Sequence, residues 1–222
     1  MAETARAHSV TMRIAVIAIV ALGVGELVAL INRELWPYFP PWVEQLNALP
    51  FYTLWAIVAL SYRAGWPAHA TCEWRVRVSE LARRDRLLIV VAGVLALWMY
   101  KDALATVLTT GPRRAIGLDL ISAAVLGPVM EEWVFRGLVW NQFVTAMDGR
   151  RGSELVALLA SSIVFGLFHT SFEGHTWQAV QQAVGHAEFG VLVGVVRWRS
   201  RSVGPGAIVH GVGNLFARLA MP

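Results

Sequence analysis

The stretch Glu131-Glu132-Trp133-Val134-Phe135-Arg136-Gly137 sets the interpretation of this chain, because it places two carboxylates and an arginine within a long apolar run. Ionisable side chains at membrane depth cost several kcal/mol, and they are retained where they pair with one another or line a polar cavity. The stretch therefore indicates either a packed ion pair or a buried polar site in a membrane protein.

The composition of the whole chain agrees with a membrane protein. Hydrophobic residues make up 56% of the 222 residues and charged residues 15%, and the mean hydropathy is +0.54. A soluble domain usually has about 25% charged residues. We therefore expect residues 1–222 to form a single integral-membrane domain. The lone Cys72 excludes an intrachain disulfide.

The apolar stretches predict an all-α, polytopic transmembrane helix bundle of about seven membrane helices, within a range of about six to eight. The first stretch lacks a cleavage-site pattern after its apolar core, so we expect it to be a retained anchor. The seven stretches cover roughly residues 13–31, 48–64, 87–109, 115–145, 154–170, 178–197 and 205–220.

The distribution of arginine predicts the orientation in the membrane. With the N-terminus in the cytoplasm, thirteen arginines fall on cytoplasmic segments and four on the other side. This bias follows the positive-inside rule. We attribute the net charge of +4 to contact with the lipid bilayer and not to a nucleic-acid surface. Lys101 is the single lysine, and the abundance of Arg, Ala, Val and Gly is typical of a prokaryote, which indicates the cytoplasmic (inner) membrane.

Helical spacing divides the roles of the two glutamates. Residues four apart share a face, whereas neighbours diverge by about 100°. We therefore expect Glu132 to pair with Arg136 and Glu131 to face a cavity. Pro128 has no N–H to donate, so it should leave the carbonyl of Ala124 unpaired and kink the helix just before the carboxylates.

Two more motifs lie in separate apolar runs, Phe165-x-x-x-His169 and His210-x-x-x-Asn214. Taken singly, each has a structural explanation: a Glu–Arg pair can clasp helices, a histidine can be a hydrogen-bonded core residue, and a His/Asn pair can bond across helices. On three helices of one chain, they together indicate a functional site. His186 and Glu188 are interpreted as structural or interfacial.

The residue types favour hydrolysis of an amide. A carboxylate and an imidazole can activate water for attack on a carbonyl. His210 and Asn214 can donate to the oxyanion that forms, each contributing about 3–4 kcal/mol. We expect no metal and no cofactor, although Glu131, His169 and His210 form a conceivable zinc site with two histidines and one carboxylate. Neither a glycine-flanked serine elbow nor a thiol with a nearby catalytic histidine is found in the sequence.

Together the three motifs resemble the CPBP family, which comprises the CAAX-prenyl endopeptidases and the bacteriocin-processing (Abi) proteins. The resemblance covers about residues 115–216 and includes Pro128 before the acidic pair and Gly137 after the arginine. It implies an intramembrane endopeptidase of the glutamic type that cuts a membrane-associated peptide or protein tail.

The resemblance also implies roles for individual residues. Glu131 and His169 would activate the water, and His210 and Asn214 would stabilise the oxyanion. Three further residues would support the site, namely Glu132, Arg136 and Phe165. Two alternatives stay open: a zinc-dependent intramembrane protease that uses the same side chains, and a non-catalytic membrane immunity or scaffold protein of the same fold.

Overall fold

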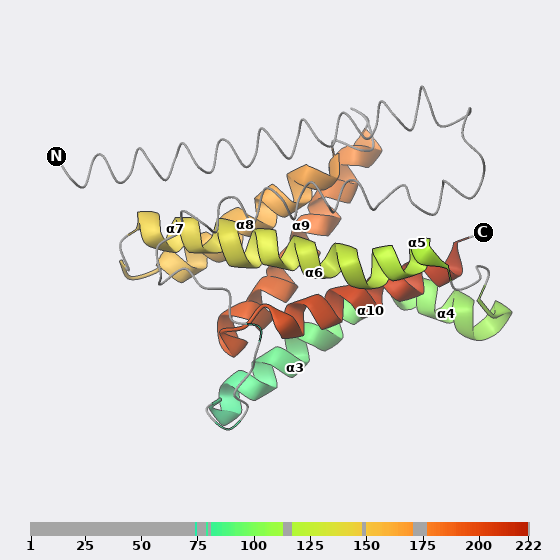
Figure 1. The fold of residues 1–222 in the computed structure, drawn as a ribbon, viewed down its shortest axis with the longest axis horizontal. Coiled ribbons are helices and arrows are strands. Elements are labelled where there is room, and N and C mark those ends of the chain that lie inside the picture. The colour runs from blue at the N-terminus through green and yellow to red at the C-terminus, as the bar shows by residue number, and fades with distance from the viewer. Residues whose placement is uncertain are drawn as a thin grey trace. The chain divides into compact units, whose positions relative to one another are not determined.

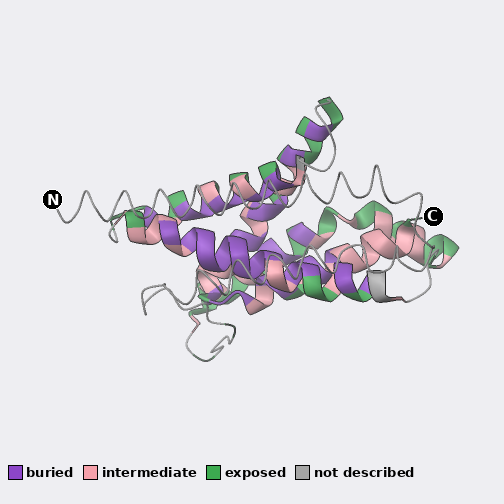
Figure 2. Cartoon of the chain, turned by 45° about the horizontal axis from the view of Figure 1, so that its top comes forward, coloured by how far each residue is buried: buried purple, intermediate pink, exposed green. Residues whose placement is uncertain are grey.

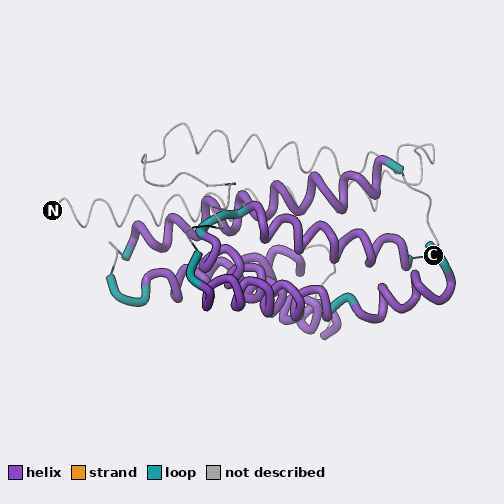
Figure 3. The backbone as a smooth tube through the Cα atoms, turned by 90° about the horizontal axis from the view of Figure 1, so that it is seen from below, coloured by secondary structure: helices purple, strands orange, loops and turns teal. Residues whose placement is uncertain are grey.

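The computed structural model describes residues 74, 79, 81–112, 117–147, 150–170 and 177–221. Within these ranges the regular structure is entirely helical, which confirms the all-α prediction for this part of the chain (Figures 1 and 3). The predicted spans 13–31 and 48–64 lie outside the described residues. The helices are α3 (Arg83–Trp98), α4 (Lys101–Thr110), α5 (Leu118–Ile121), η6 (Ser122–Leu126), α6 (Gly127–Glu132), η7 (Trp133–Val139), α7 (Trp140–Ala146), α8 (Ser153–Thr170), α9 (Trp177–Ser200) and α10 (Gly204–Ala220).

The last three predicted helices agree with α8, α9 and α10 to within three residues at every end. These helices begin and end at turns in which the backbone has a special conformation or a proline starts the next helix. Gly152 adopts a positive φ of 92° before α8, and Arg201 has a φ of 53° between α9 and α10. Pro205 stands in the first turn of α10, where its missing N–H is not needed.

The predicted helix 87–109 is instead two helices, α3 and α4, which meet at an angle of 62°. The break has a local cause in the hydrogen bonding. The N–H groups of Met99 and Tyr100 bond to carbonyls three residues back, those of Ala96 and Leu97, so the last turn tightens and α3 ends. The carbonyl of Tyr100 then accepts from Leu104 and begins α4.

The predicted helix 115–145 is continuous from Leu118 to Ala146, but two of its turns are π-helical. These turns, η6 and η7, lie directly before and after α6, which carries the glutamates. In η6 the N–H of Gly127 reaches the carbonyl of Ser122, five residues back. Turns of this type are rare and often occur at functional sites.

The packing divides the chain into two compact units. Among the described residues, the first unit is Val134–Val191, and the second comprises the described parts of Cys72–Trp133 and Leu192–Pro222. In the first unit α7 packs against α8, and in the second α10 packs against α3, α4, η6 and α6 (Figure 1). The single domain over 1–222 stays a prediction.

Small residues allow α10 to lie close to its neighbours in the second unit. A Cβ on Gly211 would collide with the carbonyl oxygen of Ala124, and a Cβ on Gly213 would collide with the ring of Tyr100. Helices in membranes associate through such close backbone approaches, because lipid provides no hydrophobic force between them. Glycine at these positions therefore brings the polar side chains of α10 near those of η6 and α6.

Buried positions gather where the helices face one another, and exposed positions lie on their outer faces and ends (Figure 2). The buried set includes charged side chains, and the exposed set includes large apolar ones. Glu132 and Arg136 are completely buried, whereas Leu87, Val94 and Trp98 on α3 are 60–64% exposed. A continuous apolar surface of this kind is expected where helices face lipid. Among the described helices, α9 is long and apolar enough to cross a membrane, and the bent pair α3–α4 makes a second if it is counted as one span.

Candidate active site

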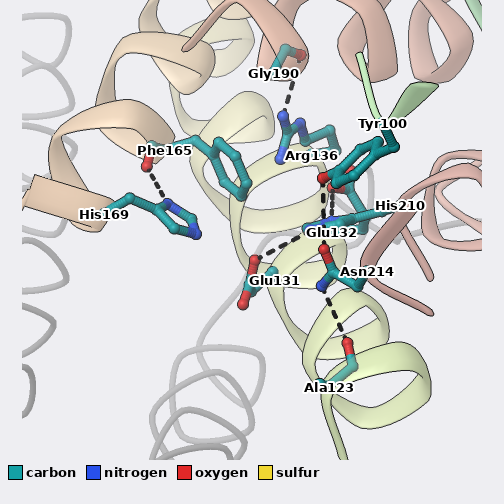
Figure 4. A network of polar contacts seen from close by, with 10 residues as sticks. All are labelled: Tyr100, Ala123, Glu131, Glu132, Arg136, Phe165, His169, Gly190, His210 and Asn214. Atoms are coloured by element: carbon teal, nitrogen blue, oxygen red, sulfur yellow. Dashed lines mark hydrogen bonds and ion pairs between the residues drawn. The ribbon is translucent and has the colours of Figure 1, made fainter. Parts of the chain in front are cut away.

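The second unit holds a carboxylate cluster, defined here as Tyr100, Glu131, Glu132, His210 and Asn214. Its centre is His210 on α10, which is buried between the two glutamates of α6 (Figure 4). The Nδ1–H of His210 donates to Oε1 of Glu132 at 3.0 Å, and its Nε2 lies 3.7 Å from Oε2 of Glu131. The imidazole therefore faces both adjacent carboxylates.

This geometry brings together two of the sequence motifs, those around Glu131 and His210. The partner that the structure gives to Glu132 was not predicted, because the spacing pointed to Arg136. Which side chain becomes the partner of Glu132 depends on how closely α10 packs against α6. The spacing of residues within one motif contains no information on that packing. The ion pair between Glu132 and Arg136 stays a prediction.

Asn214 lies one turn after His210 and is held at both ends of its carboxamide. Its Nδ2 donates to the carbonyl of Ala123 at 3.0 Å, and its Oδ1 accepts from the hydroxyl of Tyr100 at 3.5 Å (Figure 4). These two contacts assign the orientation of the amide, since the carbonyl can only accept.

The carbonyl of Ala123 is open to Asn214 because of the local helix geometry. In an α-helix Pro128 would leave the Ala124 carbonyl without a donor, as the sequence predicts. In the π-helical register of η6 the acceptor five residues before Pro128 is Ala123 instead. The carbonyl that needs a donor from outside the helix is therefore that of Ala123, one residue earlier than predicted. The side chain of Asn214 supplies this donor.

The first unit holds an aromatic cluster, defined here as Arg136, Phe165, His169, His186 and Gly190. The Nδ1–H of His169 donates to the carbonyl of Phe165 at 2.8 Å, four residues earlier in α8. The ring of His186 on α9 stacks on that of His169 at 4.1 Å, with 12° between their planes. Its own Nδ1–H donates to Gln182 at 2.7 Å. Both imidazoles therefore share one tautomer, with the proton on Nδ1.

The stacking of His186 on His169 was not predicted from the sequence. The two residues are on different helices, and no motif spacing links them. His186 was interpreted as structural or interfacial because a single histidine in an apolar run is more often a packing residue. If related sequences had shown histidine at both positions together, that pairing would have indicated the contact between His169 and His186.

Arg136 and Phe165 pack against each other in the aromatic cluster. The guanidinium of Arg136 lies 4.5 Å from the centroid of the Phe165 ring, and its Nη2 donates to the carbonyl of Gly190 at 3.0 Å (Figure 4). Both side chains are completely buried. A guanidinium over a desolvated aromatic face gains about 2 kcal/mol. Phe165 also contacts the ring of His169 at 4.5 Å, so one phenyl ring joins the arginine to the histidine.

An apolar groove of about 610 Å³ lies within the second unit, and its lining includes no residue of the carboxylate cluster. Its walls come from η6 and α6 on one side and α10 on the other, the same helices that carry Glu131 and His210. Its lining includes Ala124, Val129, Ala207, Gly211 and Leu215. In the described part of the chain, no group of three or more His, Cys, Asp or Glu side chains is arranged to hold a metal ion.

A family model described as "Type II CAAX prenyl endopeptidase Rce1-like" matches residues 114–216. The membrane-embedded CAAX protease MroQ of Staphylococcus aureus (strain USA300) is 31% identical over 61 residues, which is 27% of this chain and 25% of the relative. No solved structure gives a significant match.

Residues 114–216, called here the CAAX-protease segment, match the family model of the CAAX proteases. The family that the motifs suggested is thus confirmed, over almost the same residues as predicted. The CAAX-protease segment contains Glu131, His169, His210 and Asn214 but not Tyr100. This match and the exposed apolar face of α3 both support an integral membrane protein.

Proposed function

We propose that the chain is an intramembrane endopeptidase of the glutamic type that hydrolyses a peptide bond of a membrane-associated peptide or protein tail. The observation that carries the proposal is the position of His210, buried between Glu131 and Glu132 inside the CAAX-protease segment. A structural clasp between helices needs one carboxylate, whereas here the second one also approaches the imidazole.

In this mechanism Glu131 and His169 activate the water. The water oxygen attacks the carbonyl carbon of the peptide bond, and its proton passes to this pair. The C–N bond then breaks as the proton is returned to the leaving amine. Glu131 suits this role because its carboxylate is buried yet retains 8% exposure, whereas Glu132 has none.

Asn214 and His210 stabilise the negative charge on the substrate oxygen, and His210 does so in the form that carries a proton on Nε2 as well as the one on Nδ1 that is given to Glu132. The amide of Asn214 is fixed in orientation by Ala123, and its nitrogen carries a second N–H besides the one given to that carbonyl. A donor held in place before the reaction needs no reorganisation when the oxyanion forms. Glu132 supports the site by orienting His210, while Arg136 and Phe165 support the helix segment that carries His169.

The proposed substrate enters from the membrane. The apolar groove on the helices that carry Glu131 and His210 would take an apolar segment of a membrane-associated tail, since its walls are almost free of polar groups. We propose no nucleic-acid partner, no cofactor and about seven spans in the cytoplasmic membrane of a prokaryote, with the N-terminus in the cytoplasm.

The topology is testable with single cysteines in a Cys72→Ser background. A cysteine at Arg151, just before α8, should react with an impermeant maleimide from the cytoplasmic side. A cysteine at the exposed Trp177, at the start of α9, should react from the outside. Labelling in the opposite sense would reverse the proposed orientation.

The enzymatic proposal is tested by cleavage in nanodiscs. The purified chain is incubated with a panel of quenched fluorescent peptides that carry a prenyl group, an acyl group or an apolar tail, and the cut position is read by mass spectrometry. Wild type should cleave at least one class, and Glu131→Gln should not. Equal cleavage by both proteins would refute a glutamate mechanism, and biological activity retained by a Glu131→Gln variant would favour the scaffold alternative.

The zinc alternative makes the opposite prediction for chelation. A strong chelator should leave the proposed enzyme active. A zinc enzyme would lose activity until zinc is restored, and its bound metal would be lost in His169→Ala and His210→Ala. Metal content measured on the same preparations decides between the two.

A further inference from the structure

Tyr100 connects the part of the chain before the CAAX-protease segment to the carboxylate cluster. It stands at the 62° break between α3 and α4, fourteen residues before the family match begins at residue 114. The break ends α3 and starts α4 on either side of this residue. Both helices pack against α10, so the bend presents the phenol to α10.

The contact with α10 is specific at two neighbouring positions. The ring of Tyr100 occupies the space where a side chain on residue 213 would be, and Gly213 leaves that space open. The hydroxyl then reaches Oδ1 of Asn214 at 3.5 Å (Figure 4).

We propose that Tyr100 is a positioning residue for Asn214, a role that rests on the proposed function. An asparagine amide can turn over and exchange its oxygen for its nitrogen. With the phenol donating to Oδ1 and Ala123 accepting from Nδ2, both ends of the amide favour the same orientation. The second N–H of Asn214 is then directed by two contacts instead of one.

The distance of 3.5 Å allows this bond to change during the reaction. Hydrogen bonds around a catalytic group are often long before substrate binds and tighten in the complex. As the substrate oxygen gains charge, the donating amide of Asn214 becomes more polarised and its Oδ1 more negative, and a donor at Oδ1 stabilises that shift through the chain of bonds. The effect therefore belongs to the transition state and should appear in kcat.

The test is Tyr100→Phe, which keeps the ring against Gly213 and removes the hydroxyl alone. For a neutral hydrogen bond we expect kcat to fall about three- to tenfold, with KM and the thermal midpoint in detergent unchanged. Thr109→Val is the matched control, because it removes an exposed hydroxyl of α4 that bonds to Ala105 in its own helix. It should leave kcat as in wild type.

A double-mutant cycle shows whether Tyr100 acts through Asn214. In an Asn214→Ala background, Tyr100→Phe should have no further effect on kcat, because the amide it positions is gone. A full additional loss in that background, or a wild-type kcat for Tyr100→Phe alone, would overturn the inference. If Glu131→Gln and Asn214→Ala themselves retain wild-type kcat, the proposed function fails first. If they are inactive and Tyr100→Phe is not impaired, this inference alone fails.

Discussion

The carboxylate cluster and the aromatic cluster solve the same problem, a buried set of polar groups, in different ways. In the carboxylate cluster the contacts join side chains on helices far apart in sequence, as between His210 and Glu132. In the aromatic cluster the hydrogen bonds run to backbone carbonyls, within the same helix for Nδ1 of His169 and of His186 and on α9 for Nη2 of Arg136.

The difference teaches where each cluster is vulnerable. A histidine that bonds to the carbonyl four residues back is oriented by its own helix, and that carbonyl already has a helical donor. Removing such a side chain leaves no backbone group unpaired. A histidine that bonds to a buried carboxylate on another helix is oriented by tertiary packing, and loss of either partner affects the other.

The largest effect is expected at Glu131, the proposed base of the carboxylate cluster. Glu131→Gln should lower kcat by about 10²–10⁴, the usual contribution of a general acid–base group. The amide keeps the size of the side chain, so elution on gel filtration should be unchanged. Glu188→Gln on the exposed face of α9 is the control and should cleave like wild type. Comparable kcat values for the two variants would remove Glu131 from the mechanism.

The next effect separates the proposed donor from the stacked imidazole. Asn214→Ala should lower kcat by about 10²–10³ and leave KM nearly unchanged, because the donor acts in the transition state. His186→Phe keeps a ring against His169 and should lower kcat by less than about tenfold. Steady-state kinetics with a single substrate give kcat for both variants. If His186→Phe is as slow as Asn214→Ala, the predicted difference between the two clusters is wrong.

Unfolding should distinguish the clusters by stability. Glu132→Ala removes the carboxylate that accepts a buried hydrogen bond from His210. Because hydrogen bonds to carboxylates are stronger than neutral ones, the variant should lose about 1.5–3 kcal/mol in the free energy of unfolding. His169→Ala loses ring contacts and should cost about 0.5–1.5 kcal/mol. Detergent-induced unfolding in mixed micelles followed by tryptophan fluorescence gives both values. The comparison is wrong if His169→Ala is the less stable variant.

The last comparison concerns the glycines that let the helices of each unit approach closely, where effects on stability alone are expected. Gly211→Ala in the second unit and Gly166→Ala in the first would each push a methyl group into a backbone carbonyl, of Ala124 and Ala183 respectively. Each should cost about 1–3 kcal/mol. Gly185→Ala is the matched control, with nothing within 4 Å of the new methyl, and should gain up to about 1 kcal/mol from helix propensity. The same unfolding assay checks all three, and a stable Gly211→Ala would contradict the close approach of α10.

Sequence reasoning succeeded where the information is local or is carried by a motif. The helices α8, α9 and α10 follow apolar runs that end at turns, so their bounds were predicted to within three residues. The motifs selected Glu131, His210 and Asn214, and the structure brings these three into one cluster. Their catalytic roles stay predictions.

The features that were missed depend on tertiary structure. No proline or glycine marks the break at Tyr100, so the run 87–109 looked like one helix. A π-helical turn differs from an α-helical turn by one residue, and hydrophobic periodicity does not resolve that difference over a single turn. For this reason the open carbonyl was assigned to Ala124 and not to Ala123. The pairing of Glu132 with His210 is decided by packing between helices.

The π-helical turn η6 has a consequence for how this chain tolerates changes in length. One extra residue in a turn rotates everything before it by about 100° relative to everything after it. Loss of a single residue within Ser122–Leu126 would restore an ordinary helix, so secondary-structure content would hardly change. Yet Leu118–Ile121 would turn by that angle relative to Glu131, and the carbonyl that meets Asn214 would point elsewhere. In an alignment of homologues, a one-residue gap in this segment would therefore indicate that Asn214 has a different backbone partner, even where every motif is intact.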